Sequence, residues 1–137
     1  MSFEILRSLI GTWRLVSTSA TDDRGKVMRQ PYGPKPHGVV VFGADGRMIA
    51  VISDARTELP AGETVREFNS YSGNFEFDGE TLITHVDGSS NAHWVGGDQI
   101  RGVKFDGGRM ILVPPPRPWQ GINQHRILVW ERVSELN

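Results

Sequence analysis

Residues 81–105 contain the side chains most able to do chemistry, and they are typical of two strands joined by a loop rich in Gly, Ser and Asn. Successive side chains of a strand point to opposite faces, so Arg101 shares its face with Val103 and Phe105. A buried charge without a partner is costly. We therefore expect this face to line a cavity, in which Arg101 pairs with an acid, a water or a ligand.

The preceding strand adds titratable groups to the same region. His85 and Asp87 lie on one face of that strand, and we expect this face, with Gln99 of the next strand, to point into the cavity. There, Arg101 could bind a ligand carboxylate through two hydrogen bonds, and His85 could exchange a proton near neutral pH. Three interpretations stay open: ligand contact, a self-contained Asp87–Arg101 pair, and catalysis with His85 as the acid/base group.

Other catalytic chemistries lack the residue spacing that they need. The sequence has four histidines and no cysteine, and the histidines do not fall into a metal-binding motif. No serine lies in a Gly-x-Ser-x-Gly motif, which argues against a serine hydrolase. We expect neither a metal site nor a cofactor.

Three aromatic residues fall in the long connections between strands: Tyr32, Trp94 and Trp119. Aromatic side chains gathered around the mouth of a cavity can contact a ligand or form a rim for a protein partner. The alternative is that these loops simply pack on themselves. We count all three residues as candidate ligand contacts.

The elements that hold these residues are predicted to be strands over residues 11–19, 38–42, 47–54, 67–77, 81–87, 98–105, 109–113 and 122–133. Tight Asp-Gly turns at Asp45, Asp78 and Asp106 alternate with long connections. In an up-and-down meander, alternate connections lie at the same end, so the tight turns should close one end and the long loops should surround a mouth. We expect an all-β fold: one domain over residues 1–137, an eight-stranded antiparallel up-and-down barrel. A short helix over residues 2–10 precedes it, with Ser2 as its N-cap.

Composition restricts the class of protein. The 137 residues are 38% hydrophobic and 23% charged, with a net charge of −1, which gives no basic surplus for nucleic acid. The beginning of the chain lacks a run typical of a signal peptide, and no segment is long and apolar enough to insert into a membrane. We expect a cytoplasmic protein, and the sequence leaves a homodimer open.

Several segments in this order resemble the small bacterial and fungal lipocalin-like domain family, within the wider calycin barrels. They are residues 11–17 (GTWRLVS), 31–34 (PYGP), 45–48 (DGRM), 71–75 (YSGNF), 84–86 (THV), 93–101 (HWVGGDQIR) and 128–132 (LVWER). The resemblance implies a lipocalin-like barrel in which Trp13 plugs the closed end. It also implies that an arginine of the last strand, Arg132 or Arg126, packs over that ring.

An eight-stranded barrel is about wide enough for one small ligand. We expect a small, largely apolar ligand, with an anionic or polar group facing Arg101. One alternative is a small-molecule isomerase, cyclase or hydratase that uses the lumen as its active site. The other is a protein-interaction module that uses the mouth loops.

Overall fold

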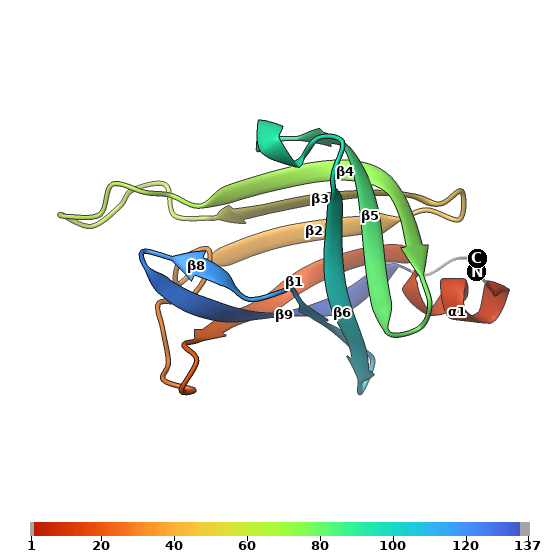
Figure 1. The fold of residues 1–137 in the computed structure, drawn as a ribbon, viewed down its shortest axis with the longest axis horizontal. Coiled ribbons are helices and arrows are strands. Elements are labelled where there is room, and N and C mark those ends of the chain that lie inside the picture. The colour runs from red at the N-terminus through yellow and green to blue at the C-terminus, as the bar shows by residue number, and fades with distance from the viewer. Residues whose placement is uncertain (1, 135–137) are drawn as a thin grey trace.

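The computed structural model describes residues 2–134, which form one short helix, a 3₁₀ turn and nine strands (Figure 1). The elements are α1 (Phe3–Leu9), β1 (Gly11–Thr21), β2 (Pro36–Phe42), β3 (Arg47–Asp54), β4 (Phe68–Phe77), β5 (Thr81–Ser89), η1 (Ala92–Trp94), β6 (Asp98–Asp106), β7 (Arg109–Val113), β8 (Arg117–Trp119) and β9 (Ile122–Ser134).

The strands form a closed antiparallel barrel. Each strand from β1 to β6 pairs with the next one, β7 pairs with β9, and β9 pairs back with β1, so eight strands complete the ring. Closure satisfies the backbone groups that an open sheet would expose at its edges. The eight-stranded barrel with a short N-terminal helix is therefore confirmed.

One strand lies outside the predicted set. Part of the proline-rich segment before β9 forms β8, a short strand in which Arg117 pairs with Gln124 of β9 and Trp119 with Ile122. The turn between β8 and β9 uses positive φ angles at Gln120 and Gly121. Because β8 is an edge strand, Pro118 can sit in it without breaking a ladder.

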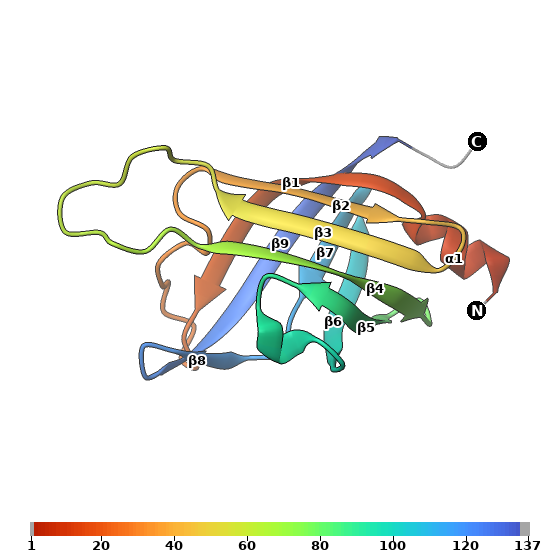
Figure 2. The same cartoon turned by 90° about the horizontal axis from the view of Figure 1, so that it is seen from above.

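The two ends of the barrel differ as the connections predict. Figure 1 shows the β2–β3 and β4–β5 turns on the side of α1. The β6–β7 turn lies at the same end, because Arg109 pairs with Glu131, which in turn pairs with Arg14 near the start of β1. The long connection over residues 55–67 extends from the opposite end (Figure 2).

Trp13 plugs the end that α1 covers. Its side chain is 2% exposed, and its Nε1 donates a hydrogen bond to the Leu9 carbonyl oxygen at 2.8 Å. The guanidinium carbon of Arg132, on β9, lies 4.3 Å from the centre of the Trp13 ring, and Arg132 also donates to the carbonyl oxygens of Ser8 and Ile10. Arg132, rather than Arg126, is thus the arginine that packs over the Trp13 ring.

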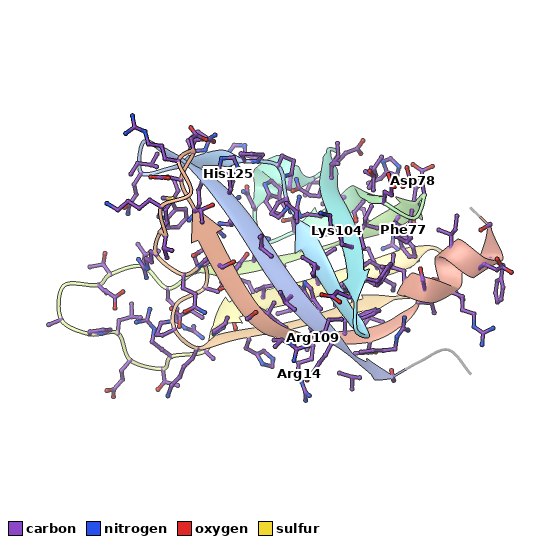
Figure 3. All side chains as sticks on the ribbon, turned by 90° about the horizontal axis from the view of Figure 1, so that it is seen from below. Arg14, Phe77, Asp78, Lys104, Arg109 and His125 are labelled. Atoms are coloured by element: carbon purple, nitrogen blue, oxygen red, sulfur yellow. The ribbon has the colours of Figure 1, made fainter. Side chains whose placement is uncertain are left out.

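The outer wall carries charged side chains together with exposed apolar ones such as Ile49 and Val51. Figure 3 shows Arg14, Lys104 and Arg109 projecting from the strands, and Arg14 forms an ion pair with Glu131 on the adjacent strand. Exposed pairs of this kind contribute little to stability. Among residues 2–134, no helix has the length and apolar character to span a membrane.

Candidate functional site

The barrel contains a cavity of about 310 Å³, at the lower end of the range for small-molecule sites. Strand alternation creates its apolar wall: on β3, Met48, Ala50 and Ile52 are buried, whereas Ile49 and Val51 are exposed. The wall is completed by further apolar side chains of β2, β4, β5, β7 and β9, which are Val40, Phe42, Tyr71, Leu82, Leu112, Leu128 and Trp130.

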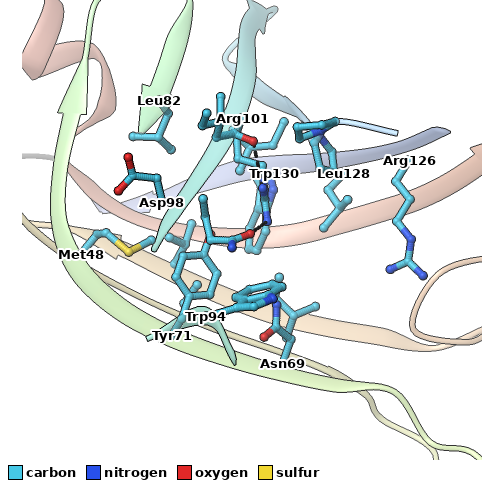
Figure 4. A pocket seen from close by; sticks show the side chains of 18 of the residues that line it. Met48, Asn69, Tyr71, Leu82, Trp94, Asp98, Arg101, Arg126, Leu128 and Trp130 are labelled. Carbon is cyan, nitrogen blue, oxygen red and sulfur yellow. Dashed lines mark hydrogen bonds between the residues drawn. The ribbon is translucent and has the colours of Figure 1, made fainter. Parts of the chain in front are cut away.

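Polar side chains from several elements also border the cavity. Figure 4 shows Asn69 beside Tyr71 and Trp94, with Leu128 and Arg126 on another side of the cavity. The polar residues that border the cavity are Tyr32, Asn69, Asp98, Gln99, Arg101, Arg117 and Arg126. An apolar cavity with a few convergent polar groups is the usual form of a small-molecule site.

Arg101 and Gln99 border the cavity, where the alternation of β6 places them. Nη2 of Arg101 donates to Oε1 of Gln99 at 3.1 Å, and Nη1 donates to the carbonyl oxygen of Ile100 at 2.9 Å. Arg101 therefore has neutral partners on its own strand. The predicted Asp87–Arg101 pair does not form, because Asp87 pairs with Arg47.

The prediction that His85 and Asp87 face the lumen is wrong. On β5 the buried side chains are Leu82, Thr84 and Val86, so His85 and Asp87 occupy the exposed face. His85 bridges two carboxylates there: its Nε2 lies 2.8 Å from Oε2 of Glu76, and its Nδ1 lies 2.7 Å from Oδ1 of Asp98.

His85 and Asp87 each have partners of opposite charge on the outer wall. The hydrogen bond to Glu76, and then that to Asp98, raises the pKa of His85 above its usual value. The hydrogen bond from Arg47, with a second from Ser72, lowers the pKa of Asp87. Neither residue borders the cavity, so neither is placed to contact a ligand in the lumen.

The three aromatic residues of the loops do not form a single rim. Tyr32 is 5% exposed and borders the cavity, with a φ of 62° that non-glycine residues seldom adopt. Trp94 also borders the cavity and packs edge-to-face against Tyr71, with ring centres 5.5 Å apart. Trp119 instead borders a separate hollow beside residues 62–65.

Arg126 connects Tyr32 and Trp119. Its guanidinium carbon lies 5.8 Å from the centre of the Tyr32 ring and 5.1 Å from the centre of the Trp119 ring. The side chain is 4% exposed. Nε donates to Oε1 of Gln124 at 2.7 Å, and Nη1 donates to Oε2 of Glu67 at 3.0 Å. Among the described residues, none accepts a hydrogen bond from Nη2.

Arg126 as a cavity residue was missed, although the signal was present. Gln124, Arg126, Leu128 and Trp130 alternate on β9, and this is the pattern that pointed to Arg101 on β6. From the sequence, Arg126 was expected only as a possible partner for Trp13. Arg117, a second missed cation, is directly opposite Gln124 on β8 and shares its face.

Electrostatics at this end of the cavity reflect burial and proximity. Burial, and then the nearby Glu67 carboxylate, raises the pKa of Tyr32, so its hydroxyl stays protonated at neutral pH. Partial burial, and then repulsion by Arg126, lowers the pKa of Arg117. Repulsion between cations indicates a region of positive potential, which an anion would relieve.

A metal centre has no support in the described part of the chain. Residues 2–134 contain no group of three or more His, Cys, Asp or Glu side chains arranged to hold an ion. The arrangement that they do contain is a mostly apolar cavity that cationic and neutral hydrogen-bond donors also border.

Comparison with known proteins agrees with this geometry. Searches among curated proteins and among solved structures found no match. The family model described as a lipocalin-like domain matches residues 10–133, from the residue after α1 almost to the end of β9. A closed eight-stranded barrel with a chamber suited to a small molecule is the architecture of such domains, and the chain belongs to the lipocalin-like domain family.

Proposed function

We propose that the barrel lumen binds one small, largely apolar molecule, with a polar or anionic group held among the polar side chains that border the cavity. The observation that carries this proposal is the partly open cavity of about 310 Å³, walled mostly by apolar side chains. Apolar surface removed from water contributes roughly 25 cal/mol per Å², so the walls supply affinity. The polar residues orient the ligand.

Two further atoms support a ligand with a polar group. Trp130 borders the cavity, and its Nε1 is buried without a hydrogen-bond partner among residues 2–134. Nη2 of Arg126 is likewise buried without a hydrogen-bond partner among these residues. Buried donors are normally satisfied, and a ligand that accepts hydrogen bonds in the lumen would satisfy these two.

The alternative functions gain less from the structure. Acid/base catalysis by His85 would need the imidazole within reach of a substrate, but His85 lies on the outer wall and is held by Glu76 and Asp98. A partner-binding rim would need exposed aromatic side chains, but Tyr32 is buried and Trp94 packs against Tyr71.

Binding can be tested with matched substitutions on two faces of β3. Ala50→Leu adds volume to the cavity wall, whereas Val51→Leu adds a methylene to the exposed face of the same strand. Calorimetry and tryptophan fluorescence would measure the affinity of a naphthalene-based probe. We expect this affinity to be the same for the unmodified protein and the Val51→Leu variant. Ala50→Leu should weaken binding at least about tenfold, the equivalent of 1.4 kcal/mol.

Thermal melting of both variants controls for misfolding, since extra core volume can destabilise a protein by about 1–3 kcal/mol. Native mass spectrometry of gently purified protein would show a retained ligand and the oligomeric state together. If the folded Ala50→Leu variant bound a panel of apolar probes with the same affinity as the unmodified protein, the probes would bind outside the lumen. The proposal would then fail.

A further inference from the structure

We propose that the ligand is an amphipathic carboxylic acid, and that its carboxylate binds between Arg126 and Arg117 beside Tyr32. This inference rests on the proposed function of the lumen. It names Arg126 and Arg117, on the β8–β9 ribbon, as the main anion contacts in place of Arg101 on β6.

The first step is the state of the Arg126 side chain. It is almost fully buried, and two of its three nitrogens are engaged, Nε by Gln124 and Nη1 by Glu67. Nη2 is buried with no partner among the described residues, and the side chain borders the cavity. A buried charged donor left unsatisfied costs a substantial free energy, so this nitrogen is a built contact point for an acceptor.

The second step is the local charge. Glu67 is the acid closest to Arg126, and both its oxygens are already used: Oε2 accepts from Arg126 and Oε1 accepts from the backbone N–H of Tyr32. Arg117 borders the same part of the cavity and faces the same side of the ribbon as Gln124. Glu67 offsets one of these two arginines, which leaves positive charge for a ligand anion.

The third step is the rigidity of the Arg126 guanidinium. Tyr32 and Trp119 contact it through their rings, and cation–π contacts are worth more when the cation is desolvated. Tyr32 keeps a backbone with φ of 62°, and such strained conformations gather at ligand sites. A guanidinium that is held in place by two rings and two hydrogen bonds loses little entropy when a ligand binds.

The fourth step is the class of ligand. Arg126 offers a single free nitrogen, so it contacts one oxygen of the anion, and Arg117 is placed to contact the second. The two-oxygen geometry of a carboxylate suits this arrangement. The rest of the ligand must be apolar, because the cavity continues from this site toward Phe42, Met48 and Leu82. These residues lie near the closed end, where β2, β3 and β5 meet the tight turns.

The experiment compares an acid with its neutral isostere. We would measure the affinities of 2-naphthoate and 2-naphthamide by calorimetry at neutral pH. The unmodified protein should bind the acid more tightly by about tenfold or more, the range for a hydrogen bond to a charged group. This acid preference, rather than the affinity itself, is the readout for the arginines.

Four variants locate the preference. Arg126→Met alone would leave Glu67 without its partner, so we would use Arg126→Met together with Glu67→Gln, and confirm folding by circular dichroism. The preference should fall to near unity in this double variant and partly in Arg117→Met. It should persist in Arg101→Met and in Arg109→Met, whose arginine lies on the outer wall.

The outcomes separate this inference from the function on which it rests. Tight but equal binding of both compounds would overturn the carboxylate site and leave lumen binding intact. Binding of neither compound would contradict lumen binding, and the site with it. An acid preference lost in Arg101→Met but retained in the double variant would overturn the assignment to Arg126.

Discussion

Replacement of Trp13 by alanine should be among the most damaging single changes to this barrel. The ring fills the end of the core under α1, where it is 2% exposed. It contacts Arg132 on one face, and its centre lies 6.2 Å from the centre of the Phe105 ring. The indole therefore joins the first strand, the last strand, β6 and the helix, and its removal disturbs all four.

The magnitude follows from what the indole does. Replacing a buried Trp by Ala typically costs 3–5 kcal/mol. The lost hydrogen bond from Nε1 to the Leu9 carbonyl oxygen adds about 1 kcal/mol, and the lost stacking with Arg132 about 0.5–2 kcal/mol. These contributions overlap, so we expect a total of about 4–5 kcal/mol, a large part of the 5–15 kcal/mol that stabilises a typical domain. Trp13→Phe keeps most of the ring and should cost about 1–2 kcal/mol.

Urea unfolding followed by circular dichroism measures this loss, provided that the transition is two-state. Ile127→Ala is a suitable control, since Ile127 lies on β9 with its side chain exposed, and it should change the free energy of unfolding by less than about 0.5 kcal/mol. A loss below about 1 kcal/mol in Trp13→Ala would refute the role of Trp13 as a plug.

Two further predictions concern titration and charge. The pKa of His85 should lie above its usual value in an NMR titration and fall in Glu76→Gln, because the hydrogen bond to Glu76 is the largest cause of the shift. Since the pKa of His85 is raised on folding, its stabilising contribution is full below the unfolded value, near 6.5, and is lost as the pH rises through the folded value. If the unfolding midpoint of His85→Gln kept the pH dependence of the unmodified protein between these two pKa values, His85 would make no such contribution. Arg126→Met should lower the free energy of unfolding by about 3 kcal/mol, because Glu67 loses its cation in a largely buried site, whereas Arg101→Met, which breaks only contacts to Gln99 and Ile100, should cost under about 1 kcal/mol. Similar losses in the two variants, measured by urea unfolding, would show that the Arg126–Glu67 pair has no special weight.

The sequence by itself determined the barrel. Asp-Gly pairs at Asp45, Asp78 and Asp106 mark local turns. Turn chemistry and strand alternation act over a few residues, so the sequence of this chain suffices to place the strands of the barrel wall. The resemblance of residues 11–17 to lipocalin-like domains implied the plug at Trp13. β8 was not predicted, because proline usually argues against a strand. An edge strand such as β8 tolerates proline.

The direction in which β5 faces was decided by tertiary structure. Ile83 and Leu82 are equally apolar, so the sequence offers both faces of this strand to the core. The pairing of β4 with β5 is irregular between Ser72 and Gly73. Asp87 lies at this irregularity, points outward and forms an ion pair with Arg47. Only the packed barrel shows that Leu82, Thr84 and Val86 turn inward.

The candidate site depends on contacts between distant segments. Arg126 and Glu67 are 59 residues apart, and Tyr32 and Trp119 reach the same guanidinium from different loops. Alternation could indicate that Arg126 faces inward, just as it did for Arg101. It could not show which nitrogen stays unpaired, because that depends on how Gln124, Glu67 and two aromatic rings meet when the barrel closes.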